Sequence, residues 1–176
     1  GGVALTSAVT EIRLQEGARL RHLRVQDESL EAFHVGTVAA RLSRDSDLHQ
    51  LSVAFGGRIS RVDVRADLDG PGASVRCDGV YLGRGQQHMD HHTVVRHHAP
   101  HTNSNELYKG VLDDKARGVF TGRVVVDKDA QQIASAQSTN NLLLSDDAVA
   151  NSRPHPELFA DDAQCSHRST LARVAP

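Results

Sequence analysis

Histidine and cysteine are the residue types in this sequence best suited to bind a metal ion, and the histidines are clustered. Six of the 11 histidines lie within 14 positions, beginning at His88. If this stretch is an extended strand, His92 and His98 point to one side and His91 and His97 to the other. Two histidines six residues apart on one face are about 20 Å from each other, too far to share one ion. We therefore favour a structural role for the cluster, with a metal site as the alternative.

The tripeptide Cys165-Ser166-His167 is a second candidate metal site. In an extended strand Cys165 and His167 share one face, about 7 Å apart, and offer a soft thiolate and an imidazole. Two ligands make only half a site for iron or a cluster. The missing ligands would have to come from another subunit, so this chemistry predicts an interface. The alternative is a partly buried cysteine beside a surface histidine.

Enzymatic chemistry is not indicated. The sequence lacks a G-x-S-x-G elbow, a P-loop and a G-x-G-x-x-G element. Cys77, next to a glycine turn, is expected to be a small buried hydrophobe. A β-solenoid enzyme acting on polysaccharides would need several carboxylates on one exposed face. The adjacent aspartates at 113–114, 146–147 and 161–162 would point to opposite faces, so we expect turns there and no enzyme.

Composition bounds the fold and the partners. The 176 residues suit a single domain, 1–176, and the net charge of −2 gives no field to attract nucleic acid or an anionic membrane. No run of 18 apolar residues and no export signal is evident, which predicts a cytoplasmic protein. The two cysteines, 88 positions apart, cannot complete a tetrahedral metal site alone.

Alternating apolar residues predict strands rather than helices. Val62, Val64 and Ala66 alternate with charged residues, and apolar residues recur near Leu23 and Leu51. Turn residues separate these runs at 56–57, 69–72, 78–79 and around Pro154. The segment Ser138–Asn141 is expected at a corner that leads into a core strand.

A weak repeat favours a solenoid. Leu20, Leu48 and Val75 each follow a turn-like cluster, at spacings of 28 and 27 residues. Coils of this length would stack to complete a shared core. An all-β sandwich with evenly spaced turns is the alternative.

Five segments, in order, resemble the SufB/SufD family of the SUF iron–sulfur cluster assembly system, and its SufD branch more than its SufB branch. They are Asp78–Thr93 with His98–Thr102, Glu106–Val111, Arg117–Val126, Gln137–Ala148 and Ala160–His167.

The resemblance implies a right-handed parallel β-helix with about two strands per coil. It further implies a non-catalytic scaffold that pairs with SufB through its late strands and works with the SufC ATPase. A nascent iron–sulfur cluster would form transiently at the SufB interface, with no cofactor in the isolated chain. His167 would take part in cluster assembly, and Cys165 has a weaker claim.

The sequence also departs from the family pattern. Arg168 stands where a turn glycine is expected, which predicts backbone strain. These 176 residues lack the amino-terminal helical region of the family and the carboxy-terminal helices that dock SufC. We therefore expect that the 176-residue chain does not retain SufC. A homodimer without a metal role is the alternative for an isolated chain, because the unpaired backbone groups of an open sheet edge can pair with a second copy.

Overall fold

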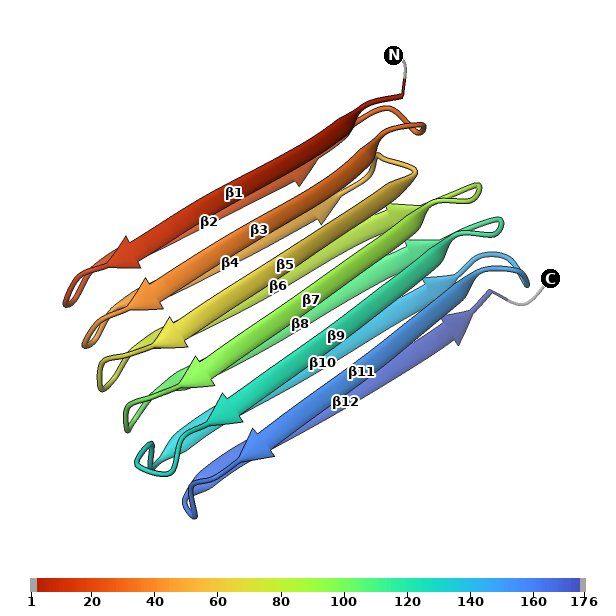
Figure 1. Ribbon diagram of the computed structural model, residues 1–176. Coiled ribbons are helices and arrows are strands. Elements are labelled where there is room, and N and C mark those ends of the chain that lie inside the picture. Colours follow the sequence, from red (N-terminus) through yellow and green to blue (C-terminus); the bar gives the residue numbers. More distant parts are fainter. Residues whose placement is uncertain (1–2, 175–176) are drawn as a thin grey trace.

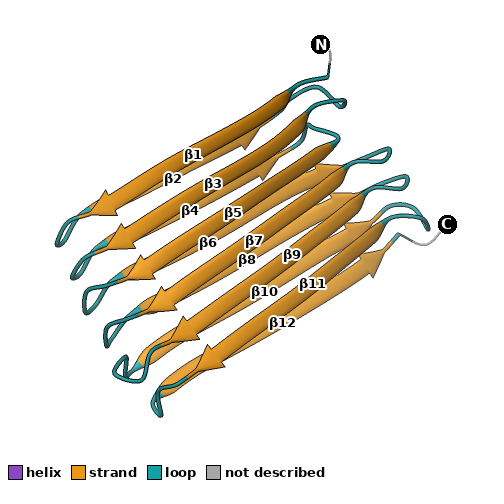
Figure 2. Cartoon of the chain, in the orientation of Figure 1, coloured by secondary structure: helices purple, strands orange, loops and turns teal. Residues whose placement is uncertain are grey.

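The computed structural model describes residues 3–174, and these form twelve β-strands joined by short turns (Figures 1 and 2). The strands are β1 Leu5–Leu14, β2 Arg19–Gln26, β3 Phe33–Leu42, β4 Asp47–Ala54, β5 Ile59–Leu68, β6 Ser74–Gly83, β7 His88–His97, β8 Asn103–Leu112, β9 Arg117–Val126, β10 Ile133–Leu143, β11 Val149–Leu158 and β12 Ala163–Arg173.

Odd-numbered and even-numbered strands form two parallel sheets. The orders are β1-β3-β5-β7-β9-β11 and β12-β10-β8-β6-β4-β2. Each consecutive pair of strands is therefore one coil of a β-solenoid, as Figure 1 shows. The prediction of two strands per coil is confirmed, and the sandwich alternative is wrong. Residues 3–174 contain no helix long and apolar enough to cross a membrane.

The internal repeat read from the sequence is the coil itself. Leu20 lies beside Leu48 in the sheet, and Leu48 lies beside Val75. The corners between strands need left-handed backbone, which glycine adopts at Gly57 and Gly72 (φ 80° and 73°). The aspartate pairs at 113–114, 146–147 and 161–162 all lie in connections between strands, as expected.

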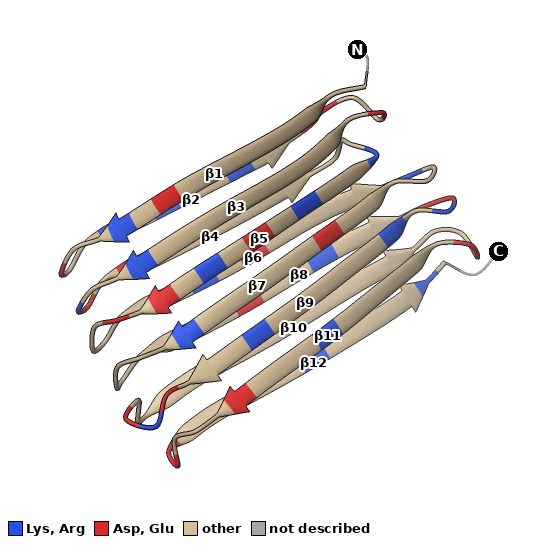
Figure 3. Ribbon diagram, in the orientation of Figure 1, with Lys and Arg blue, Asp and Glu red and all other residues tan. Residues whose placement is uncertain are grey.

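Alternation along each strand creates an inner and an outer face. Val62, Val64 and Ala66 are buried between the sheets, while the charged residues between them point outward. On the outer face of the odd-numbered sheet, opposite charges lie on neighbouring strands (Figure 3). Arg61 of β5, for example, bonds Asp90 of β7 at 3.0 Å. The outer face of the even-numbered sheet is apolar near its start, where Leu23 and Val25 are exposed.

Two predicted turns are strand interiors instead. Ser138–Asn141 lies within β10, where Asn141 points inward and accepts a hydrogen bond from the Tyr81 hydroxyl at 2.5 Å. Gly79 lies within β6, where an added Cβ would come 2.2 Å from the Tyr108 ring. Both residue types are common in turns, but here Gly79 leaves space for the buried Tyr108 ring and Asn141 binds the buried Tyr81 hydroxyl.

Prolines mark one open edge of the solenoid. Pro154 and Pro156 were also expected at a turn, yet both lie within β11. The N–H groups of Val149 and Phe159 donate to the neighbouring β9 side. By alternation, even-numbered positions of β11 therefore point their nitrogen to the open edge, where proline loses no hydrogen bond.

Candidate metal-binding half-site at the open end of the solenoid

The clustered histidines are divided between the two faces of β7, as predicted. His91 and His97 are buried between the sheets, whereas His92 points outward, with its Nε2 3.0 Å from Oδ1 of Asp90. His101 adopts left-handed backbone at the corner after β7 (φ 61°). In residues 3–174, no three metal-ligating side chains come close enough to hold an ion.

His91 and His97 are held neutral by burial. His91 stacks on Tyr81 with ring centroids 4.8 Å apart, and its ring nitrogens have no hydrogen-bond partner among the described residues. Burial, with smaller effects from Arg24 and His92, lowers the pKa of His91 to about 3. Burial and His98 lower the pKa of His97 to about 4. These histidines serve packing and internal hydrogen bonding.

Polar side chains continue along the interior of the even-numbered sheet. Glu106 of β8 is buried and accepts hydrogen bonds from Thr93 and from Gln137 of β10, the latter at 3.0 Å. Burial raises the pKa of Glu106, and these two hydrogen bonds oppose the rise. Gln137 in turn lies beside His167 of β12 in the sheet. His167 is therefore the next position of an internal polar row.

Cys165 and His167 lie on the inner face of β12, in line with the buried residues Ser135 and Gln137 of β10. In residues 3–174 no further coil stacks on β11 and β12, so these side chains lie at the open end of the core. Cys165 is half-buried and His167 is exposed. The predicted shared face is thus present, and Cys77, by contrast, is fully buried.

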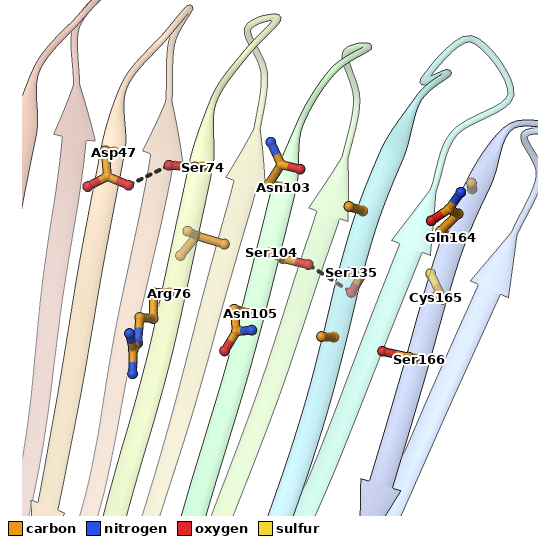
Figure 4. Close-up of a pocket in the computed structure, with 14 residues that line it drawn as sticks. Asp47, Ser74, Arg76, Asn103, Ser104, Asn105, Ser135, Gln164, Cys165 and Ser166 are labelled. Carbon is orange, nitrogen blue, oxygen red and sulfur yellow. Dashed lines mark hydrogen bonds between the residues drawn. The ribbon is translucent and has the colours of Figure 1, made fainter.

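A groove of about 770 Å³ crosses the beginnings of the even-numbered strands and reaches Cys165. Figure 4 shows Ser104, Ser135 and Cys165, which line this groove from β8, β10 and β12, three neighbouring strands of the even-numbered sheet. Burial raises the pKa of the Cys165 thiol, and a hydrogen bond with Ser135 partly offsets the rise. The thiol is therefore protonated until a ligand that binds sulfur displaces its proton.

The backbone of β12 offers an unblocked edge beside these side chains. Val174 donates its N–H to Leu143 of β10 at 3.0 Å. By alternation, the N–H groups of odd-numbered residues, including Cys165 and His167, point to the open edge. No proline interrupts β12, in contrast to β11. A strand of another subunit would find its hydrogen-bond partners here.

Arg168 causes no backbone strain. It lies within the extended strand β12, and no left-handed φ occurs there. The expected glycine turn was therefore wrong, because β12 continues through this position to Arg173.

Sequence reasoning missed Ser104, Ser135 and Gln137. Their signal was available in the spacing, because Ser104, Ser135 and Cys165 follow one another at 31 and 30 residues, the length of one coil. Serine and glutamine are common on strand surfaces, so only the inward register distinguishes them.

Comparison with known proteins adds independent evidence. The sequence profile described as "SUF system FeS cluster assembly, SufBD core domain" matches residues 1–176. An iron–sulfur cluster assembly SufBD family protein of Synechocystis is 31% identical over 94% of this chain and 37% of its own length. Protein ABCI7, chloroplastic, of Arabidopsis thaliana is 29% identical over 97% of this chain and 36% of its own length. Iron-sulfur cluster assembly protein SufD of Escherichia coli is 28% identical over 96% and 40%, respectively. The chain thus spans well under half the length of these relatives.

Proposed function

Because this chain belongs to the SufBD core family of the SUF iron–sulfur cluster assembly system, we propose that it is a non-catalytic scaffold of the SufD type. In this proposal it pairs with a SufB subunit through β12 and works with the SufC ATPase. The observation that carries the proposal is the position of Cys165 and His167 at the open end of the core, beside an unpaired sheet edge.

The chemistry proposed for this site is the temporary holding of a growing cluster, which is cargo rather than a resident cofactor. A thiolate and an imidazole suit iron, and the exposed His167 is the more accessible of the two ligands. Two ligands cannot hold a cluster on their own, so SufB would supply the others.

The proposed pairing direction follows from the two edges at this end of the solenoid. Pro154 and Pro156 remove edge N–H groups from β11, while β12 keeps all of its own. A partner strand would therefore add to the even-numbered sheet, alongside Cys165 and His167. The same edge favours a second candidate, a homodimer of this chain without a cluster role.

The test is co-expression of the full-length protein with SufB and SufC, as wild type, His167→Ala and His155→Ala. His155 is exposed on the outer face of β11 in the same coil, so it is a matched control. We expect all three complexes to form, with iron and acid-labile sulfide lost only in His167→Ala. Normal cluster content in His167→Ala would remove His167 from the site, and a chain that forms only homodimers would favour the second candidate.

A further inference from the structure

One histidine on the outer surface, His98, links three consecutive coils. It directly follows β7, and its Nδ1 lies 2.7 Å from Oδ2 of Asp127, which directly follows β9. Its other ring nitrogen, Nε2, lies 3.6 Å from Oδ1 of Asp67 in β5. The imidazole of His98 therefore stands between a carboxylate of the preceding coil and a carboxylate of the following coil.

The imidazole attracts both carboxylates only when it is charged, because only the imidazolium carries a hydrogen on each ring nitrogen. Partial burial alone would lower the pKa of His98, but the hydrogen bond and charge of Asp127, together with Asp67, outweigh it and raise the pKa. The contact with Asp127 is the shorter one. A neutral His98 therefore keeps its hydrogen on Nδ1, toward Asp127, and loses its attraction to Asp67.

Other charged or titratable groups lie on the elements that meet at His98. They are Arg96 on β7, Asp69 after β5, Lys128 beside Asp127, and the histidines His97 and His101. Arg96 Nη1 lies 3.4 Å from the same oxygen of Asp67, so part of the link between β5 and β7 persists at every pH. The pKa of the buried His97, about 4, keeps that ring neutral while His98 changes its charge.

His98 lies at the end of a corner that borders the groove. The corner 98–102 leads into β8 and the corner 127–132 leads into β10, and both strands line the groove near their beginnings. The N–H of His101 donates to the carbonyl of Gln131 at 2.9 Å, which joins the two corners. The N–H of His98 donates to the carbonyl of Leu68 at 3.1 Å, which holds the first corner to the end of β5.

We propose that His98 is a pH-sensitive clasp between coils: its imidazolium holds the corner 98–102 to β5, and loss of the Nε2 proton to water loosens that corner beside the groove. The folded pKa lies above the unfolded value of about 6.5, so this stabilisation is complete below about pH 6.5. It is lost as the pH rises through the folded pKa. The clasp goes beyond the proposed function, since it requires neither SufB nor a cluster.

The experiment is residue-resolved NMR of the full chain between about pH 5.5 and 8.5. The ring chemical shifts of His98 report its charge, and His98→Gln identifies them by their loss. Hydrogen exchange of the His98 amide, corrected for its intrinsic pH dependence, reports the link to β5. The amide of Asp127, which donates to the carbonyl of His97 at 3.0 Å, reports the link that a neutral His98 keeps.

We expect the protection of the His98 amide to fall by up to about fivefold as the ring loses its proton, because an exposed ion pair is lost. Protection of the Asp127 amide should stay constant. Asp67→Asn should lower both the titration midpoint of His98 and the protection of its amide. Asp129→Asn, which removes an exposed carboxylate from the corner after β9, is the matched control and should change neither.

Constant protection of the His98 amide across the titration would overturn the inference, as would an unchanged midpoint in Asp67→Asn. An equal loss of protection at Asp127 would also overturn it, because the opening would then be general. Since the measurement needs no SufB and no cluster, its failure leaves the proposed function standing. A normal cluster content in His167→Ala would, in turn, leave the clasp untouched.

Discussion

The same inward positions of the solenoid have opposite environments in its closed coils and in its last coil. Glu106, Gln137 and His167 occupy one row across neighbouring strands, as do Ser104, Ser135 and Cys165 in the next. In the closed coils the following coil covers these positions. Burial there raises the pKa of Glu106 and lowers that of His97, which favours the neutral form of each. In the last coil nothing in the described residues covers them.

This difference teaches that a place in the repeat does not determine a role. An inward polar side chain in a closed coil must find its hydrogen bonds within the protein, and it contributes to packing. An inward side chain in the open coil can instead remain exposed, as His167 does. The variants below test whether coverage by the next coil separates the two classes.

The largest expected contrast is between the two cysteines. Cys165 should react with an alkylating reagent in the native chain, whereas Cys77 is fully buried and needs an opening of the solenoid. Since such openings cost much of the unfolding free energy, we expect Cys77 to react at least ~10³-fold more slowly. Mass spectrometry of the labelled peptides over time measures both rates. Comparable rates would mean that the closed coils are not closed.

A second contrast uses two positions of one inward row, Gly79 in β6 and Ser169 in β12. In Gly79→Ala the new Cβ would overlap the Tyr108 ring, and we expect a loss of about 3 kcal/mol of unfolding free energy. Ser169→Ala, in the open last coil, removes one hydrogen bond with Thr139, whose hydroxyl keeps Ser152 as a partner, so it should lower the unfolding free energy by no more than about 1 kcal/mol. Urea denaturation of both variants is the measurement. Equal losses would contradict the comparison.

A third contrast is a pH dependence of stability that comes from the closed coils. The folded pKa of His97, about 4, is below the value near 6.5 of an unfolded histidine. Stability from this group is therefore complete above pH 6.5 and falls as the pH drops from 6.5 toward 4, by up to about 1.4 kcal/mol per pH unit. His97→Gln should flatten this slope, and His91 should leave a remainder. Denaturation midpoints between pH 4 and 7 measure it; an unaltered slope in His97→Gln would argue against a neutral buried His97.

Much of the fold was readable from the sequence because coil stacking imposes a regular spacing. The register of Leu20, Leu48 and Val75 and the division of the histidines between two faces both followed from periodicity. Gly79, Asn141 and Pro154 were misassigned to turns, because residue type alone does not reveal a tyrosine to accommodate or an open edge that tolerates proline.

The candidate site was only partly readable. The shared face of Cys165 and His167 followed from strand alternation, and the structure shows both on the inner face. Which face was inner, and that the last coil leaves it uncovered, required the arrangement of all the strands. The hydrogen bonds from Ser135 through Ser104 to His97 join residues from two different coils, and no local sequence pattern predicts them.

The most direct measurement is residue-resolved hydrogen exchange of β12 in the full-length protein, alone and with SufB. The account predicts that the amides of Cys165 and His167, which point to the open edge, exchange rapidly alone and at least tenfold more slowly with SufB. Ser166 and Arg168 point to β10 and serve as internal references. Slowed exchange in β11 or on the apolar outer face near Leu23, with β12 unchanged, would contradict the claim that β12 is the strand that pairs with SufB.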